Sequence, residues 1–223
     1  MLDFWTRAPL VFWSVVFFVF GTVVGSFLNV CIHRMPLDLS LAKPGSQCPK
    51  CGFAIPWRLN IPIVSWLWLR GRCRQCAEPI SPRYLGVELL TGLAFLASWL
   101  AFGAQTTPGV LLAVTWGFVL AGLIVATFID FEHFIIPDQI TLGGVAVGFI
   151  VSAGLPALHH VTRPADSLMA SGLGILVGAG SVFAVLQLGK LLFGKVRVPL
   201  EEGELATFTE SALHLPGEVV PFE

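Results

Sequence analysis

Two pairs of cysteines lie in a polar stretch of this 223-residue sequence. Cys48 and Cys51 form the first Cys-x-x-Cys pair, Cys73 and Cys76 form the second, and 21 residues separate the pairs. Four thiolates at this spacing can surround a tetrahedral zinc ion, with each pair closing a tight turn. The pattern therefore predicts a structural zinc site. An iron–sulfur centre or a redox dithiol pair would use the same residues and stays an alternative.

Carboxylates at the end of an apolar stretch are the second candidate for chemistry. Asp130 follows an apolar run that ends at Ile129. An ionisable group at such a depth is a functional-site hypothesis by default, and a solvated residue at a helix end is the alternative. Asp138 follows Pro137. A Pro-Asp step ahead of a helix is commonly a turn whose carboxylate favours the helix dipole, so Asp138 is the weaker candidate.

Glu88 and Cys31 also occur in or beside apolar runs. A carboxylate at position 88 needs water or a partner such as an arginine of the polar stretch, which makes Glu88 a candidate for a functional role. Cys31 is interpreted as a small buried apolar residue, with only His33 nearby as a base. No Gly-rich nucleotide loop follows a predicted strand, so the cofactor-binding residues cannot be read from the sequence.

The composition indicates the environment in which these residues act. Hydrophobic residues make up 55% of the chain and charged residues only 12%, with a mean hydropathy of +0.81. These values exclude a disordered chain, a collagen-like fibre and a typical soluble enzyme. A net charge of −1 gives no general attraction to nucleic acid, and no nucleic-acid partner is expected. The sequence predicts an all-α, polytopic transmembrane helix bundle in a lipid bilayer.

Five apolar segments are long enough to span the hydrocarbon core, which takes about 20 residues. They cover residues 8–30, 84–102, 109–129, 140–158 and 168–193. Thr106 or Thr107 is expected to cap the third helix, and Pro137 with Asp138 is expected to open the fourth. Two small-xxx-small spacings, Gly21 with Gly25 and Gly174 with Gly178, would let helices approach closely.

The basic residues predict the orientation of the chain. Eight of the 13 lysines and arginines lie between His33 and Arg83, so the positive-inside rule places this loop in the cytoplasm. Alternate crossing then places Asp130 and the tail inside, and residues 1–7, 103–108 and 159–167 outside. The predicted organisation is a first transmembrane helix within residues 1–30, a cytoplasmic zinc loop at 31–83, membrane helices at 84–193, and a cytoplasmic tail or the start of an insertion at 194–223.

Four motifs follow one another between residues 20 and 140. They are GSFLNVCIHRMP at 25–36, the two cysteine pairs, SPRY at 81–84 leading to VELLTG at 87–92, and Ile129-Asp130 with Ile136-Pro137-Asp138. In this order and spacing they resemble the motifs of the bacterial type IV prepilin peptidases, a GxGD-type aspartic protease family.

The resemblance implies an inner-membrane enzyme that cuts the basic leader from type IV prepilins and type II secretion pseudopilins on the cytoplasmic side. It also implies that the new N-terminus is methylated with S-adenosylmethionine in many members that carry the cysteine-rich loop. Asp130 matches the first of the family's two catalytic aspartates. Two carboxylates that share a proton can activate water and protonate the leaving amine.

The family's second catalytic aspartate lies in a Gly-x-Gly-Asp segment, which this sequence lacks. The last aspartate is Asp166, which the predicted topology places outside. We expect that the chain is incomplete and that the second motif follows Glu223. The alternatives are a shortened homologue that binds pilins or assembly proteins without hydrolysing them, and a pairing of Asp130 with Asp138. A membrane scaffold unrelated to pilins is a further, weaker alternative.

Overall fold

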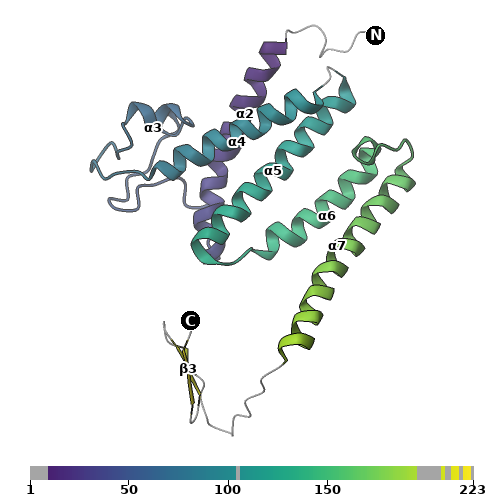
Figure 1. Ribbon diagram of the computed structural model, residues 1–223. Helices are drawn as coiled ribbons and strands as arrows, with labels where there is room; N and C mark the ends of the chain where they lie inside the picture. The colour runs from purple at the N-terminus through teal and green to yellow at the C-terminus, as the bar shows by residue number, and fades with distance from the viewer. Residues whose placement is uncertain (1–9, 104–105, 195–206, 209–211, 216–217, 222–223) are drawn as a thin grey trace. The chain divides into compact units, whose positions relative to one another are not determined.

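The computed structural model describes residues 10–103, 106–194, 207–208, 212–215 and 218–221. The chain divides into two compact units, residues 1–175 and 176–223. The described elements are the helices α2 (Leu10–Arg34), α3 (Val64–Trp68), α4 (Pro82–Phe102), α5 (Thr107–His133), α6 (Asp138–Gly154) and α7 (Pro164–Phe193), and the 3-10 helices η1 (Met35–Leu37), η2 (Trp57–Leu59) and η3 (Pro156–His159) (Figure 1).

The predicted helical membrane architecture is confirmed, with one difference in length. Helices α2, α4, α5 and α7 are long and apolar enough to cross a membrane. Helix α6 has 17 residues and is therefore about 25 Å long, a little short of the roughly 30 Å hydrocarbon core. The fourth predicted span, 140–158, ends early because the chain turns into η3 at Pro156.

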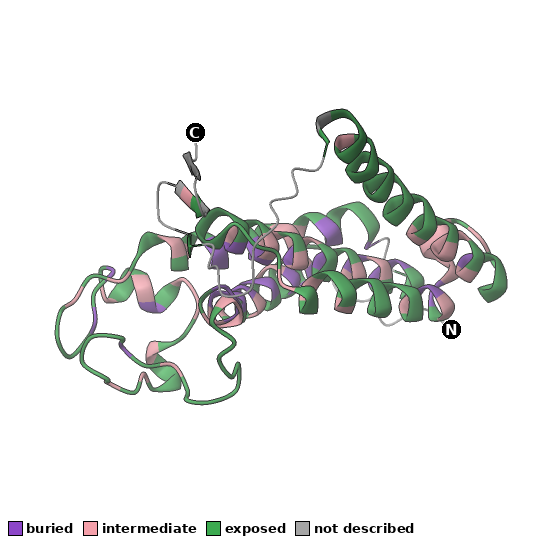
Figure 2. Cartoon of the chain, turned by 90° about the horizontal axis from the view of Figure 1, so that it is seen from below, coloured by how far each residue is buried: buried purple, intermediate pink, exposed green. Residues whose placement is uncertain are grey.

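Helices α2, α4 and α5 pack side by side and enclose most of the buried residues (Figure 2). A Cβ added at Gly21 of α2 would lie 2.8 Å from the Phe95 Cβ of α4, and one added at Gly25 would lie 2.8 Å from the Glu88 Cα. The predicted close approach at Gly21 and Gly25 is therefore confirmed. Nothing lies within 4 Å of a Cβ added at residue 174 or 178 among the described residues, so the same expectation for that pair stays a prediction.

Aromatic rings fill the space between these three helices. Phe17 stacks on Trp99 with ring centroids 4.8 Å apart. Phe95 is fully buried and meets Phe20 and Phe118 edge to face, with both centroid distances 5.4 Å. Such aromatic pairs each contribute about 0.5–1.5 kcal/mol beyond the burial of their area. The contacts between the helices are thus mainly apolar.

Two helices continue beyond their predicted ends. Helix α2 runs to Arg34, four residues past Val30, and Cys31 lies buried in its last turns, as expected of a small apolar residue. Helix α5 runs to His133, so Asp130 lies inside its last turn and not at its end. Basic side chains end both helices, Arg34 in α2 and His133 in α5, where positive charge complements the negative end of the helix dipole.

The predicted starts of the third and fourth helices are confirmed, whereas the fifth begins at Pro164, four residues before the predicted span. The Thr106 hydroxyl accepts a hydrogen bond from the Gly109 N–H at 3.3 Å and caps α5. Helix α6 begins at Asp138, directly after Pro137. At the other end of α5, Phe134 takes a left-handed conformation, and its N–H donates to the Asp130 carbonyl at 2.9 Å.

The last part of the chain contains three short antiparallel strands, which the sequence analysis did not predict. They are β1 (Thr207–Phe208), β2 (Ala212–Leu215) and β3 (Glu218–Pro221), in that order across the sheet. Phe208 pairs with Leu213, and Leu213 with Val220. The predicted outer segment 1–7 and most of the predicted tail at 194–223 lie outside the described residues.

Candidate functional site

The four cysteines of the two Cys-x-x-Cys pairs converge in the loop between α2 and α4. All four sulfur atoms lie within 4.8 Å of one another. The Sγ atoms of Cys48 and Cys76 are 3.8 Å apart, and those of Cys51 and Cys73 are 4.0 Å apart. A tetrahedral metal with sulfur bonds of about 2.3 Å requires sulfur–sulfur separations of about 3.8 Å. The arrangement therefore fits a metal ion bound by four sulfurs.

Each cysteine pair is held by the same two backbone hydrogen bonds. In the first pair, the Gly52 N–H donates to the Cys48 carbonyl and the Cys48 N–H donates to the Phe53 carbonyl, both at 3.0 Å. The second pair repeats these bonds around Cys73 and Ala77, at 3.0 and 2.8 Å. The residue after each pair has a positive φ, 70° at Gly52 and 57° at Ala77. The two turns are thus conformational repeats of each other.

The thiols of the cluster differ in acidity. The backbone N–H groups of Cys51 and Lys50 lower the pKa of the Cys48 thiol to about 7. The Glu78 backbone N–H lowers the pKa of Cys76, but burial and the other three thiols outweigh it and raise that pKa to about 12. Four adjacent thiols cannot all ionise without a compensating positive charge, which a divalent cation at the centre would supply.

Glu88 connects the membrane helices to this loop. Its side chain is 8% exposed, and its Oε2 accepts a hydrogen bond from the Ile63 N–H at 2.7 Å. Ile63 is the central residue of a γ-turn, with φ 63° and ψ −53° and a 2.6 Å bond from the Val64 N–H to the Pro62 carbonyl. The sequence left the partner of Glu88 open between water and a group such as an arginine, and in the structure the Ile63 backbone N–H is a partner.

Asp130 and Asp138 lie on either side of the connection between α5 and α6. Both side chains are exposed. No hydrogen bond or ion pair joins either carboxylate to another side chain among the described residues. Asp166 lies on a different element, in the first turn of α7. The structure brings Asp130 and Asp138 to one connection and leaves Asp166 elsewhere.

Arg83 and Glu132 form an ion pair that the sequence analysis missed. It joins the first turn of α4 to the last turn of α5, two residues after Asp130. The Asn29 side chain of α2 adds a second link at this end of the bundle, since its Nδ2 donates to the Tyr84 carbonyl at 3.0 Å. This pair could have been expected from the order of the helices. Because α4 and α5 are consecutive and antiparallel, the start of one lies beside the end of the other.

In the comparison with known proteins, two family models match consecutive parts of the chain. The bacterial peptidase A24 N-terminal domain matches residues 19–102, and the type IV leader peptidase family matches residues 117–197. The first match ends at the last residue of α4 and therefore includes the cysteine loop. The second includes Asp130, Asp138 and Asp166.

Curated relatives agree with these matches. Three are prepilin leader peptidase/N-methyltransferases, each similar to this chain over most of its length. The protein of Myxococcus xanthus is 39% identical over 80% of this chain and 56% of its own length. That of Aeromonas hydrophila is 38% identical, over 84% and 68%, and that of Klebsiella pneumoniae is 36% identical, over 82% and 77%. The chain thus spans between about half and three quarters of these relatives. No solved structure matches the chain.

Proposed function

Because the chain belongs to the type IV leader peptidase family, we propose that it is a membrane aspartic endopeptidase that removes the basic leader from type IV prepilins or pseudopilins. The observation that carries the proposal is the position of Asp130. It lies in the segment matched by the peptidase model, in the last turn of a long apolar helix, with an exposed carboxylate. A carboxylate in this place is accessible to a substrate helix that leaves the membrane.

The catalytic chemistry requires a second carboxylate beside Asp130. A pair of carboxylates can share a proton, so that one acts as base towards water and the other as acid towards the leaving amine. Asp130 is the proposed first member of this pair. Asp138 is the weaker candidate for the partner, since the family resemblance assigns the second aspartate to a different motif.

The proposed orientation places Asp130 and the cysteine loop on the cytoplasmic side of the inner membrane. Basic residues concentrated in the loop favour this orientation. The leader of a prepilin is basic and its following segment is apolar, so the leader would meet the protein at the same membrane surface as Asp130.

We assign zinc to the four-cysteine cluster. Cys48, Cys51, Cys73 and Cys76 supply four sulfurs at tetrahedral separations, a donor set typical of structural zinc. Zinc bound in this way has no open coordination position, so it would crosslink the loop and take no part in hydrolysis. The loop buries few apolar side chains, and metal binding would supply much of its folding free energy.

N-methylation of the new N-terminus is proposed because the relatives are prepilin leader peptidase/N-methyltransferases. S-adenosylmethionine would supply the methyl group. Two cavities of about 270 and 280 Å³ open on the helix faces of the described chain, and apolar side chains line nearly all of both. They do not fit a charged nucleoside, so no residue is assigned to this cofactor.

The test is leader cleavage by the full-length gene product in membranes that contain a prepilin. Asp130→Asn should abolish cleavage, because the amide can neither share nor transfer the proton. Asp166→Asn is the matched control and should cleave normally. Wild-type cleavage by the Asp130 variant would refute the proposal. Loss of cleavage in Asp138→Asn as well would identify Asp138 as the partner.

A non-catalytic pilin-binding component is the second candidate function. Such a component would bind pilin leaders or assembly proteins through the cysteine loop. The purified chain would then retain a prepilin in a pull-down without cutting or methylating it, and Asp130→Asn would leave that retention unchanged.

A further inference from the structure

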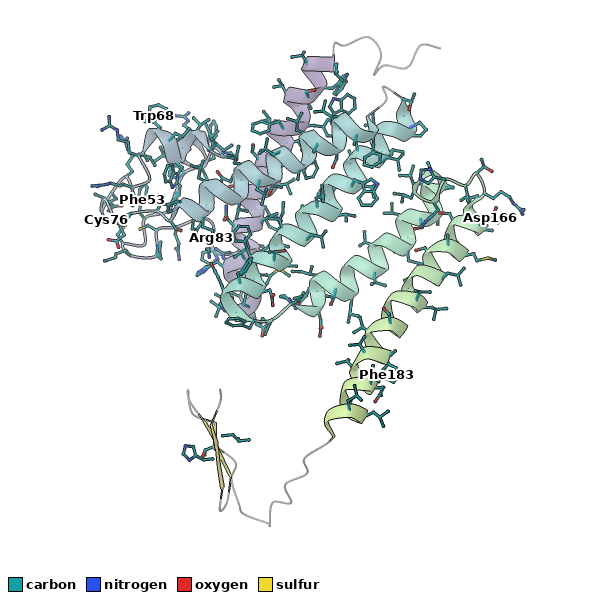
Figure 3. All side chains as sticks on the ribbon, in the orientation of Figure 1. Phe53, Trp68, Cys76, Arg83, Asp166 and Phe183 are labelled. Carbon is teal, nitrogen blue, oxygen red and sulfur yellow. The ribbon has the colours of Figure 1, made fainter. Side chains whose placement is uncertain are left out.

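The short helix α3 presents an apolar face to the outside of the cysteine loop. Val64, Leu67 and Trp68 share one side of the helix and are 51%, 57% and 78% exposed. The opposite side faces inward, where Ser65 is buried and the Trp66 Nε1 donates to the Ile80 carbonyl at 3.2 Å. Figure 3 shows Trp68 at the surface of α3, apart from Cys76 at the tip of the loop. Loop folding thus leaves this face uncovered among the described residues.

The hydrogen bond to Glu88 sets the level of α3 relative to the membrane helices. Glu88 is the seventh residue of α4, which begins at Pro82, so it lies about 9 Å along the helix axis. Ile63, the residue before α3, is bonded to it at 2.7 Å. The interfacial layer on each side of a bilayer is roughly 5–8 Å thick. Helix α3 is therefore held beside the first two turns of α4, and we place the bilayer surface at this level because α4 is long and apolar enough to cross a membrane.

Positive charge accompanies the apolar face. Arg58, Arg70 and Arg72 are exposed in the segment that contains α3. The Arg58 guanidinium lies over the Trp57 ring, 5.4 Å from its centroid, and Trp57 is itself 74% exposed. Segments that lie in the interface of an anionic membrane typically combine exposed tryptophan and leucine with arginine.

We propose that α3 is an interfacial anchor for anionic phospholipid. Val64, Leu67 and Trp68 enter the boundary between headgroups and acyl chains, and Arg58 and Arg70 bind the lipid phosphates. The occupant of this face is lipid because the Glu88 bond holds the face at bilayer level and the arginines complement anionic headgroups. This proposal requires only a membrane location and does not depend on the peptidase activity.

Hydrogen–deuterium exchange of the full chain in lipid nanodiscs tests the anchor. Amides of residues 61–70 should exchange more slowly in nanodiscs of phosphatidylcholine with phosphatidylglycerol than in phosphatidylcholine alone or in detergent. The double variant Leu67→Ser, Trp68→Ser should lose this protection in every lipid. Each of Arg58→Gln and Arg70→Gln should reduce the difference between the two lipids about fivefold.

Two matched controls come from the same loop. Leu39→Ser and Lys43→Gln change an exposed leucine and a lysine outside α3 and should leave the protection unchanged. Exchange of residues 47–54 reports that the cysteine loop stays folded in every variant. Equal exchange in both lipids and in detergent would overturn the proposal, and so would protection that persists in the double serine variant. Either result would indicate that the apolar face of α3 binds a protein and not lipid.

Discussion

The helices α2, α4 and α5 and the loop between α2 and α4 are held together by different forces. Between the helices, glycines allow close contact and aromatic rings fill the remaining space. In the loop, most of the order comes from four sulfurs, two repeated backbone turns and the bond from Ile63 to Glu88. The packing of the helices therefore depends on complementary shape, which many sequences can provide. The folding of the loop depends instead on a few particular atoms.

This difference predicts which substitutions should destabilise each region. A change of volume should separate the helices and leave the loop's chemistry intact. Removal of one ligand or one acceptor should unfold the loop and leave the helices packed. The following changes test this separation, from the largest expected effect to the smallest.

Replacement of Cys48 and Cys73 by serine should cause the largest change. Structural zinc sites carry on the order of 10 kcal/mol of binding free energy, which the loop would lose. Metal analysis should fall from about one zinc per chain to none, and exchange protection in the loop should disappear. Cys31→Ser, which alters a buried cysteine outside the cluster, should keep its metal. Full metal content in the double variant would show that the ligands are other groups.

Gly21→Leu should be the most disruptive single change in the helices. The new side chain would meet the Phe95 Cβ, the Thr91 carbonyl and the Gly92 Cα within 2.9 Å. Separation of α2 from α4 should cost about 3 kcal/mol of unfolding free energy, measured by thermal denaturation in detergent. Gly144→Leu is the control, since nothing lies within 4 Å of its added Cβ. Equal stability of the two variants would contradict close packing at Gly21.

Glu88→Ala should release the loop from the helices. The half-buried Ile63 N–H would lose its acceptor at a cost of about 2 kcal/mol, and its amide should exchange faster with solvent. Glu88→Gln keeps a side-chain oxygen and should show less than half of this effect. Unchanged exchange at Ile63 in the alanine variant would mean that the bond does not hold the loop.

The two turns of the metal cluster offer the smallest and most symmetrical test. Gly52→Ala places a Cβ on a residue with φ 70°, so it should weaken zinc binding by about 1 kcal/mol. Ala77→Gly removes the strain of a non-glycine residue at φ 57°, so it should strengthen zinc binding by up to about 1 kcal/mol. Competition with a chelator measures both. Shifts of the same sign in both variants would show that the turns are not equivalent.

The positions of the helices followed from the sequence because apolar length and capping residues are local signals. Thr106 and Pro137 mark the starts of α5 and α6 as expected. The ends were less predictable. Arg34 and His133 remain helical although the apolar runs stop earlier, because hydropathy measures the span of the bilayer and not the hydrogen bonding of the last turn.

The candidate sites also differ in how far the sequence predicts them. The cysteine cluster was predicted from spacing alone, since four ligands with fixed geometry leave few arrangements. The partner of Glu88 was not predicted, because Ile63 is 25 residues away and offers only a backbone N–H. The ion pair between Glu132 and Arg83, which joins two helices, was not predicted either. Backbone donors and tertiary ion pairs leave no pattern in the residue types.

The Glu88 bond also has a consequence for how the chain is made. A ribosome delivers residues 35–81 before it delivers position 88, so the cysteine-bearing segment emerges while its attachment point is still unsynthesised. The strained turn at Ile63 can be secured only once the helix that starts at Pro82 has entered the bilayer. Folding of the segment therefore depends on insertion of the second span.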